Sequence, residues 1–287
     1  MSQPIAVITG ATSGIGEIGA RAVAAAGYEL LLLCRSPDKG EATRERIQTE
    51  VHDAAIRIIE CPMDSLAAVR DCAVQLARDY PRIDLLINNA GTAEMQYSRT
   101  VDGIERSFAV NHLAHFVLTW HLLPSLKAAG DADGARIVHT ASEAHYVANK
   151  DFLDDINWEK GRYFVFRAYS NSKLANVLFS QKLARELEGS GLVSNCFHPG
   201  RVATNIWPER RWYEKLVIGL LKKFYLISPE QGARPLIHLA LDPDMGRRNG
   251  VFYFEMQEKD IKSFAKDPAL QDALWNKSLE LAADYLD

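Results

Sequence analysis

The sequence has few cysteines, no excess of positive charge and no long apolar run. Its four cysteines, at positions 34, 61, 72 and 196, form no C-x-x-C motif, which argues against a disulfide framework and favours reduced thiols. The 33 basic side chains are outnumbered by 37 acidic ones, giving a net charge of −4 and no field that would bind nucleic acid. Residues 1–4 carry no basic leader, and no apolar run approaches the ~18 residues of a membrane-spanning helix, so we expect a cytoplasmic protein.

The rest of the composition is typical of a soluble globular protein. Of the 287 residues, 47% are apolar and 24% are charged, which argues against disorder and collagen-like sequence. A single α/β domain of this length is ordinary. Because the chain shows no repeat, low-complexity tract or Gly/Ser-rich linker, we expect one domain over residues 1–287.

Short apolar runs alternate with longer segments that have apolar residues every three or four positions. The first three runs are rich in Leu, Ile and Val without polar alternation, as in parallel strands covered on both faces. The pattern predicts an α/β fold, a Rossmann-type doubly wound parallel sheet of seven strands with helices on both faces. The predicted strands are Ile5–Thr9, Glu29–Cys34, Ala55–Glu60, Ile83–Asn88, Arg136–Thr140, Leu192–Phe197 and Val251–Phe254. The predicted helices are Gly14–Ala26, Lys39–Val51, Ser65–Tyr80, Val101–Leu126, Tyr169–Leu187 and Ser228–Leu241.

Two long connections do not fit this alternation. Residues 143–168 form an aromatic insertion between a strand and a helix, and residues 205–227 mix five aromatic with five basic side chains. Long connections in a compact fold are often functional.

A glycine-rich segment, Thr9–Gly16, follows the first strand and opens the first helix. Its glycines allow a tight turn, and the positive N-terminus of the helix favours the diphosphate of a dinucleotide. The spacing is G-x-x-x-G-x-G rather than the commoner G-x-G-x-x-G. We interpret the segment as a dinucleotide site, the alternative being a structural glycine turn.

Tyr169 and Lys173 lie four positions apart, which places a phenol and an ammonium on one face of a helix. A free tyrosine ionises near pH 10, and lowering that value by about three units needs about 4 kcal/mol of preferential phenolate stabilisation. A partly desolvated lysine can supply part of it. Tyr and Lys occur by chance at this spacing on many helix surfaces, so the motif by itself is weak evidence for a catalytic site.

The order of the motifs along the chain is a more specific indication of the protein family than any single motif. Taken together they resemble the short-chain dehydrogenase/reductase family over nearly the whole chain, which implies a cofactor half at about 1–140 and a catalytic and substrate half at about 141–287. The segments that carry the resemblance are Thr9–Gly16, Asn88-Asn89-Ala90-Gly91, Asn111, Ser142, Tyr169 with Lys173, and Pro199-Gly200.

Within that family the chain resembles the retinol-dehydrogenase-like branch. Ser142 and Tyr169 are widely separated in the sequence, as they are in this branch, and residues 110–116, 157–160 and 172–178 carry further similarity. The N-terminal membrane anchor of several relatives is not seen here, which argues against stable membrane residence.

The resemblance implies a role for each catalytic position. Tyr169 would be the general acid when a carbonyl is reduced, and Lys173 would lower its pKa and hold the nicotinamide ribose. Ser142 would hydrogen-bond the substrate oxygen, and Asn111 would anchor a water to Lys173. The cofactor-binding positions would be Gly10, Thr12, Ser13, Gly14, Ile15, Gly16, Arg35, Lys39, Asp64, Asn89, Ala90, Gly91, Tyr169, Lys173, Pro199, Gly200, Val202 and Thr204.

The choice of cofactor is argued from charge at the end of the second strand. NAD enzymes usually carry an acidic residue there, whereas this chain has Cys34 and Arg35. A guanidinium pairs with a 2′-phosphate, so we expect NADP(H), the alternative being a solvated surface charge. Asp64 either contacts adenine or caps the helix that begins near Ser65.

The substrate is predicted from apolar surface. Trp207 and Trp212 lie in residues 205–227, which we expect to form a lid over a bulky lipophilic alcohol or ketone, such as a retinoid, a steroid or an aryl ketone. His145, three positions after Ser142, is a further candidate substrate contact. We expect no metal, because His112 and His115 supply only two ligands and packing explains them better.

Other readings stay open. The chain could be an NAD-dependent secondary alcohol dehydrogenase, a catalytically silent nucleotide-sensing protein, or a lipid-surface protein that uses residues 205–227 for weak membrane contact. A homodimer through the two long helices that hold Asn111 and Tyr169 is slightly favoured over a monomer.

Overall fold

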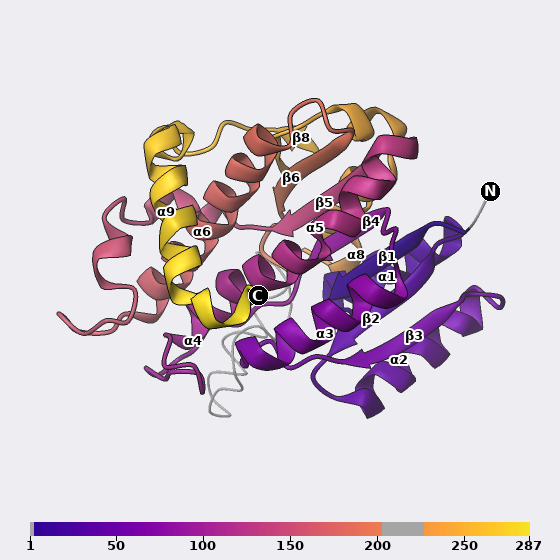
Figure 1. Ribbon diagram of the computed structural model, residues 1–287, viewed down its shortest axis with the longest axis horizontal. Coiled ribbons are helices and arrows are strands. Elements are labelled where there is room, and N and C mark those ends of the chain that lie inside the picture. The colour runs from indigo at the N-terminus through magenta and orange to yellow at the C-terminus, as the bar shows by residue number, and fades with distance from the viewer. Residues whose placement is uncertain (1–2, 203–226) are drawn as a thin grey trace.

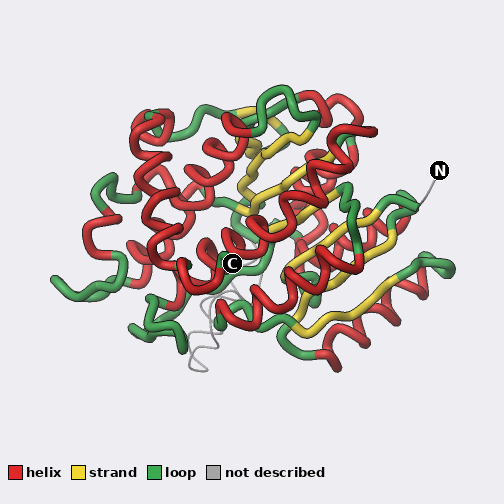
Figure 2. Tube along the Cα trace, viewed as in Figure 1, coloured by secondary structure: helices red, strands yellow, loops and turns green. Residues whose placement is uncertain are grey.

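A single twisted sheet forms the centre of the molecule (Figures 1 and 2). The computed structural model describes residues 3–202 and 227–287. Within these residues the strand order is β3-β2-β1-β4-β5-β6-β7-β8, and the β7–β8 pair is antiparallel whereas the other strand pairs are parallel. The strands are β1 (Ile5–Thr9), β2 (Glu29–Cys34), β3 (Ile56–Glu60), β4 (Leu85–Asn88), β5 (Ala135–Thr140), β6 (Leu192–His198), β7 (Phe252–Phe254) and β8 (Gln257–Glu258).

The predicted fold class is confirmed. All seven expected strands are present and parallel, and the bounds of β1 and β2 agree to the residue. These two strands are buried along nearly their whole length, as their unbroken apolar sequence requires. The short β8 was not predicted, because a two-residue strand leaves no periodic signal.

Helices cover the two faces of the sheet. One face is covered by α1 (Gly14–Ala25), α2 (Pro37–Glu50) and α8 (Pro229–Leu241), which share an apolar cluster with β1 and β2. The other is covered by α3 (Leu66–Asp79), α5 (Ala114–Asp133) and α6 (Val165–Glu186). The predicted helix at 101–126 is divided into α4 (Arg106–Phe108), a π-helical turn η1 (Ala109–Leu113) and α5.

A helix near the C-terminus, α9 (Pro268–Leu281), was missed by the sequence analysis. It starts with Asp267 as its N-cap, followed by proline in the first turn. In Figure 1 it lies over α6, on the near side of the molecule. Its Trp275 ring lies 5.0 Å from that of Phe116 on α5, so α9 covers part of the surface through which we expected a homodimer. That homodimer stays a prediction.

The insertion at 143–168 is ordered by packing rather than by regular structure. It contains two short 3₁₀ turns, and Phe152 and Ile156 are buried in the cluster beneath α5 and α6. The side chain of Asn157 accepts a hydrogen bond from the backbone N–H of Glu105 at 2.9 Å, which fixes the insertion to the start of α4. Within residues 3–202 and 227–287, no helix combines the length and apolarity needed to cross a bilayer.

Candidate active site

The glycine-rich turn after β1 is shaped by close backbone contacts. Gly10 adopts a φ of +67°, and a Cβ placed there would lie 2.7 Å from the Cα of Ala90. A Cβ at Gly16 would lie 2.2 Å from the carbonyl oxygen of Gly10. Only glycine fits at either position, so the turn that was predicted from these glycines requires them.

Asn89, at the end of β4, holds the turn in place. Its side-chain amide donates to the carbonyl oxygens of Thr9 at 3.2 Å and Gly10 at 3.0 Å. Its side-chain oxygen accepts from the hydroxyl of Thr140 at 3.0 Å. Three strand ends are thus tied together at the carboxyl edge of the sheet, where doubly wound folds bind their ligands.

The start of α1 is suited to an anion. Ser13 is the N-cap residue, and its side chain makes no capping hydrogen bond to the N–H groups of the first turn. Those N–H groups and the helix dipole favour a phosphate. Gly10 and Gly16 let the chain pack tightly behind this helix start, and the N–H groups of the first turn fit the diphosphate of a dinucleotide.

Tyr169 and Ser142 meet at the carboxyl edge of the same sheet. Ser142 follows β5 and is buried, whereas Tyr169 is half-buried in the first turns of α6. Desolvation raises the pKa of Tyr169 to about 12, and a hydrogen bond with the Ser142 side chain partly opposes this rise. The phenol is therefore protonated at neutral pH and able to donate a proton.

Lys173 is buried, at 2% exposure, one turn further along α6. Its Nζ donates to the carbonyl oxygen of Thr140 at 2.9 Å and lies 5.7 Å from the centre of the Tyr169 ring. Burial lowers the pKa of Lys173 to about 8. Desolvation holds the pKa of Tyr169 above its ordinary value, and a lowering of that pKa by Lys173 stays a prediction.

Asn111 lies in the π-helical turn η1 and joins two sides of the site. Its side-chain amide donates to Ser172 Oγ and to the carbonyl oxygen of Thr92, both at 2.9 Å, while its Oδ1 accepts from the N–H of Thr92 at 2.7 Å. A Cβ at Gly91 would lie 3.3 Å from this Oδ1 and 3.6 Å from Lys173 Nζ, so both atoms border the same small space. Asn111, Ser142, Tyr169 and Lys173 are thus gathered beside the glycine-rich turn, as predicted from the sequence.

Comparison with known proteins agrees with this geometry. Residues 4–153 match the short chain dehydrogenase family. Human retinol dehydrogenase 13 is 34% identical over 279 residues, covering 96% of this chain and 83% of that protein. Mouse retinol dehydrogenase 12 is 34% identical over 277 residues, with 96% and 85% covered. The chain belongs to the short-chain dehydrogenase/reductase family.

Solved structures of similar fold support the assignment. An uncharacterized protein from Mycobacterium Paratuberculosis has a TM-score of 0.77 at 32% identity, with 98% of this chain and 94% of that chain covered. An NADP active-site complex of RhlG from Pseudomonas aeruginosa has a TM-score of 0.66 at 26% identity, with 88% and 94% covered. This short-chain dehydrogenase/reductase is therefore an oxidoreductase related to retinol dehydrogenases and acting on CH–OH groups.

The predicted adenosine-side residues of this short-chain dehydrogenase/reductase lie around the ends of β2 and β3. Arg35 and Lys39 are both exposed at the start of α2. Asp64 does not cap a helix: the N-cap of α3 is Ser65, whose Oγ accepts from Ala68 N at 3.4 Å. Asp64 instead pairs with Arg106 at 2.7 Å, a partner that the sequence did not reveal.

The segment after β6 carries the last of the predicted cofactor residues. Gly200 has a φ of +84°, and a Cβ there would lie 2.5 Å from Ile227 Cδ1. Val202 forms an isolated parallel bridge with Ile227, which places it beside the start of α8. Thr204, Trp207 and Trp212, together with residues 205–226 of the predicted lid, lie outside the described residues.

His145 was predicted as a substrate contact, and this stays a prediction. Its side chain is fully buried, with Nδ1 at 2.6 Å from the carbonyl oxygen of Ser142. Its Nε2 accepts from the N–H of Lys262 at 3.3 Å. Both ring nitrogens are engaged by backbone, so His145 braces the loop that carries Ser142.

A polar group that the sequence analysis missed borders the site. Glu143, directly after Ser142, lies 3.3 Å from Arg201 Nε and 3.9 Å from His198 Nε2. His198 is buried, and neither of its ring nitrogens has a hydrogen-bond partner among the described residues. Burial lowers its pKa to about 4. The position of Glu143 and His198 next to two recognised motifs was the only signal in the sequence.

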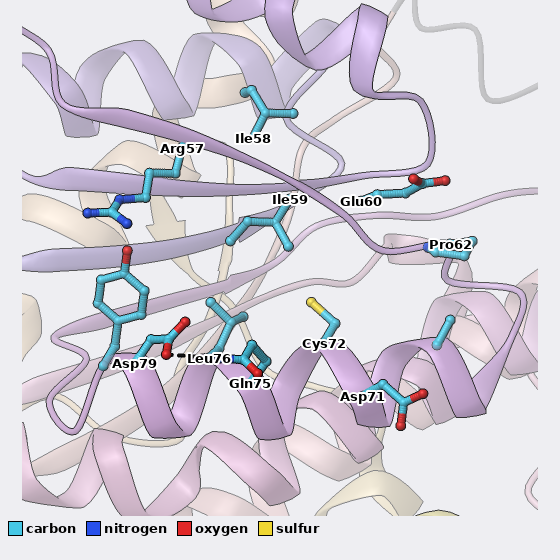
Figure 3. Close-up of a pocket in the computed structure, with 12 residues that line it drawn as sticks. Arg57, Ile58, Ile59, Glu60, Pro62, Asp71, Cys72, Gln75, Leu76 and Asp79 are labelled. Carbon is cyan, nitrogen blue, oxygen red and sulfur yellow. Dashed lines mark hydrogen bonds between the residues drawn. The ribbon is translucent and has the colours of Figure 1, made fainter.

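A groove of about 600 Å³ lies elsewhere, between β3 and α3 (Figure 3). Its lining includes Arg57, Cys72 and Tyr80, and none of the predicted site residues. Within the described residues there is also no group of three or more His, Cys, Asp or Glu that could hold a metal ion.

Proposed function

We propose that the protein is an NADP(H)-dependent oxidoreductase that interconverts a carbonyl and an alcohol on a bulky lipophilic substrate. The observation that carries the proposal is the contact between a protonated Tyr169 and Ser142, with Lys173 one turn away, beside a glycine turn that fits a dinucleotide. When bound, the coenzyme supplies or accepts the hydride.

Tyr169 is the proton donor in the direction of reduction. Its raised pKa keeps the proton on the phenol at neutral pH, which is the form that a general acid needs. Ser142 lies beside the phenol and binds the same substrate oxygen, so that a hydroxyl dipole stabilises negative charge developing there. In the reverse direction Tyr169 takes the proton back as a base.

Lys173 and Asn111 position the acid and its surroundings. Lys173, held on the Thr140 carbonyl, keeps a positive charge near the phenol at pH values below its pKa of about 8. That charge favours transient phenolate after proton transfer. Asn111 fixes the Thr92 backbone against α6, and we propose that it anchors a water to Lys173.

The preference for NADP(H) rests on Arg35. Its guanidinium is exposed immediately after β2, where the adenosine ribose lies in doubly wound dinucleotide sites. A forked contact with a 2′-phosphate suits arginine. The solved relative RhlG, at 26% identity, is described as an NADP complex, which is consistent with this choice.

The lipophilic substrate class rests on the relatives. Retinol dehydrogenases 11, 12, 13 and 14 are all about one third identical to this chain over nearly its full length. An apolar substrate is bound mainly through buried area, about 25 cal/mol per Å², which discriminates weakly between similar molecules. Retinoids, steroids and aryl ketones all fit that description.

Replacing Tyr169 by Phe tests the catalytic proposal. We expect kcat for carbonyl reduction to fall by about 10²–10⁴-fold because the proton donor is lost. NADPH affinity, measured by fluorescence titration, should stay within about twofold of wild type, because the aromatic ring remains. Tyr163→Phe is the matched control: it removes a hydroxyl of the insertion that contacts the Glu94 carbonyl oxygen and Glu105 Oε1, and it should leave kcat unchanged. Full activity of Tyr169→Phe would refute the proposal.

Replacing Arg35 by Asp tests the coenzyme. Loss of a charge-assisted contact of about 1.5–3 kcal/mol should raise the KM for NADPH by about 10–100-fold, with little change for NADH. Arg44→Asp makes the same charge change on α2, where Arg44 pairs with Glu41, and should leave both KM values near wild type. An NADPH KM unaffected by Arg35→Asp would favour the NAD-dependent alternative.

A further inference from the structure

A buried histidine links the glycine-rich turn to the turn that carries Asn111. His115, at the start of α5, is 2% exposed. Its Nε2 lies 2.9 Å from Thr9 Oγ1, and its Nδ1 lies 3.0 Å from the carbonyl oxygen of Asn111. The imidazole therefore bridges the last residue of β1 and the π-helical turn η1.

The hydrogen bonds around Thr9 fix which nitrogen of His115 carries the proton. Thr9 Oγ1 accepts from the backbone N–H groups of Asn89 and Ala90, both at 2.9 Å. A hydroxyl has two acceptor sites and one proton, so the remaining interaction must be a donation. The donation goes to His115 Nε2 at 2.9 Å in preference to the Ile87 carbonyl at 3.3 Å.

With Nε2 accepting, Nδ1 must carry the proton and donate to Asn111. The opposite tautomer would set a bare Nδ1 against a carbonyl oxygen and bring a third donor to Thr9. The resulting chain runs from the Ala90 N–H through Thr9 and His115 to the Asn111 carbonyl, and every group in it is satisfied.

The Asn111 turn is where such a brace is needed. A π-helical turn is wider than an α-helical turn and disturbs the regular i to i+4 pairing of carbonyls and N–H groups. His115 brings an additional side-chain donor to the Asn111 carbonyl. On the other side, the Asn111 side chain binds Thr92 and Ser172, so the turn is held at both ends.

We propose that His115 is a positioning residue for the reaction. Through its bonds to Asn111 and Thr9, it holds Asn111 at a fixed distance from the glycine-rich turn. This inference rests on the proposed function. His115 does not act as an acid or base: burial lowers its pKa to about 4, so the ring is neutral throughout the neutral pH range. The link is therefore a fixed brace rather than a pH switch.

Two amide variants separate the two ends of the brace. The amide of His115→Asn takes the place of Nδ1 and keeps the bond to Asn111 while losing Thr9; we expect weaker NADPH binding by about tenfold, with kcat within about threefold of wild type. The amide of His115→Gln takes the place of Nε2 and reaches Thr9 but not Asn111. It should show the reverse pattern, a kcat about tenfold lower with near-normal NADPH affinity.

His115→Leu removes both bonds, and His112→Leu is its matched control. His112 is equally buried three positions earlier, but its Nε2 bonds Ser278 Oγ on α9 at 2.8 Å and takes no part in the brace. We expect kcat/KM to fall by about 100-fold in His115→Leu and less than about threefold in His112→Leu. Thr9→Val also removes the acceptor of the Asn89 and Ala90 N–H groups, so it should still lower kcat/KM in His115→Leu, but by a smaller factor than in wild type, because the Thr9–His115 bond is already lost there. Equal losses in the two leucine variants, or fully additive losses with Thr9→Val, would overturn the inference.

Nitrogen-15 spectra of the coenzyme-free protein test the tautomer without activity. We expect a protonated Nδ1 and a bare Nε2 for His115; a protonated Nε2 would overturn the inference even if the leucine variants failed to fold. The proposed function fails separately, if wild type turns over no carbonyl or if Tyr169→Phe keeps full activity. In that case the spectra and the NADPH titrations still decide whether the brace exists and whether the coenzyme turn depends on it.

Discussion

The two faces of the sheet are built in different ways. On the face of α1, α2 and α8, the buried cluster consists of aliphatic residues with Phe197 and Tyr253, and helices approach closely through glycine: a Cβ at Gly19 would lie 2.6 Å from Leu236. On the face of α5 and α6, buried polar side chains such as Asn111, His115 and Lys173 are interleaved with the apolar core.

The difference shows how the fold separates packing from chemistry. Buried polar groups are costly unless each finds a partner, and those of the candidate site lie together where α5 and α6 pass the carboxyl ends of β4 and β5. The close glycine contacts of the glycine-rich turn lie at the carboxyl edge of the sheet, against Asn89 and Ala90. Among the described residues, α9 adds a further helix over α6 and contacts α5 through Trp275 on the face that carries the candidate site.

The largest loss of stability should come from removing the packing of α9 against α5 and α6. Trp275→Ala takes away the ring that contacts Phe116, Trp120 and Phe179, and should cost about 3 kcal/mol in the free energy of unfolding. Urea denaturation measures the change. Phe166→Ala, which truncates an exposed aromatic on α6, should cost less than about 0.5 kcal/mol. Equal costs would mean that α9 contributes no packing of its own.

A smaller but more selective effect should follow from crowding the glycine turn. In Gly16→Ala the new methyl group would meet the Gly10 carbonyl and the Asn89 side chain, and the turn must open. We expect NADPH affinity to fall by about 100-fold, which is about 2.7 kcal/mol. Gly161→Ala, where nothing lies within 4 Å of the added Cβ, is the control. Unchanged NADPH binding by Gly16→Ala would separate the turn from the coenzyme.

The smallest effect concerns the buried charge on the catalytic face. The pKa of Lys173 is about 8 in the folded chain against 10.5 ordinarily, so between these values the unfolded chain binds more protons. Stability should therefore rise with pH in this window: from pH 7 to pH 9.5, wild type should gain about 2 kcal/mol relative to Lys173→Met. Denaturation at several pH values measures this difference. Parallel pH profiles for the two proteins would show that Lys173 is not desolvated as described.

Much of the catalytic arrangement could be predicted because it is local in sequence. Tyr169 and Lys173 share a helix face through their four-residue spacing. Gly10 and Gly16 indicate a tight turn, because no other residue fits at either position. The ion pair of Asp64 with Arg106 and the burial of His145 could not be predicted, since each depends on a partner from another element. Local spacing does not encode such partners.

The sequence by itself determined the order of strands and helices, the parallel sheet and the glycine turn, because apolar periodicity and backbone freedom are properties of short segments. Tertiary structure alone decided that α9 lies over α5 and α6, that Tyr169 keeps its proton despite a neighbouring lysine, and that His115 joins Thr9 to Asn111. Those outcomes depend on desolvation and on hydrogen bonds between residues distant in the chain, which exist only once the sheet and its helices have been assembled.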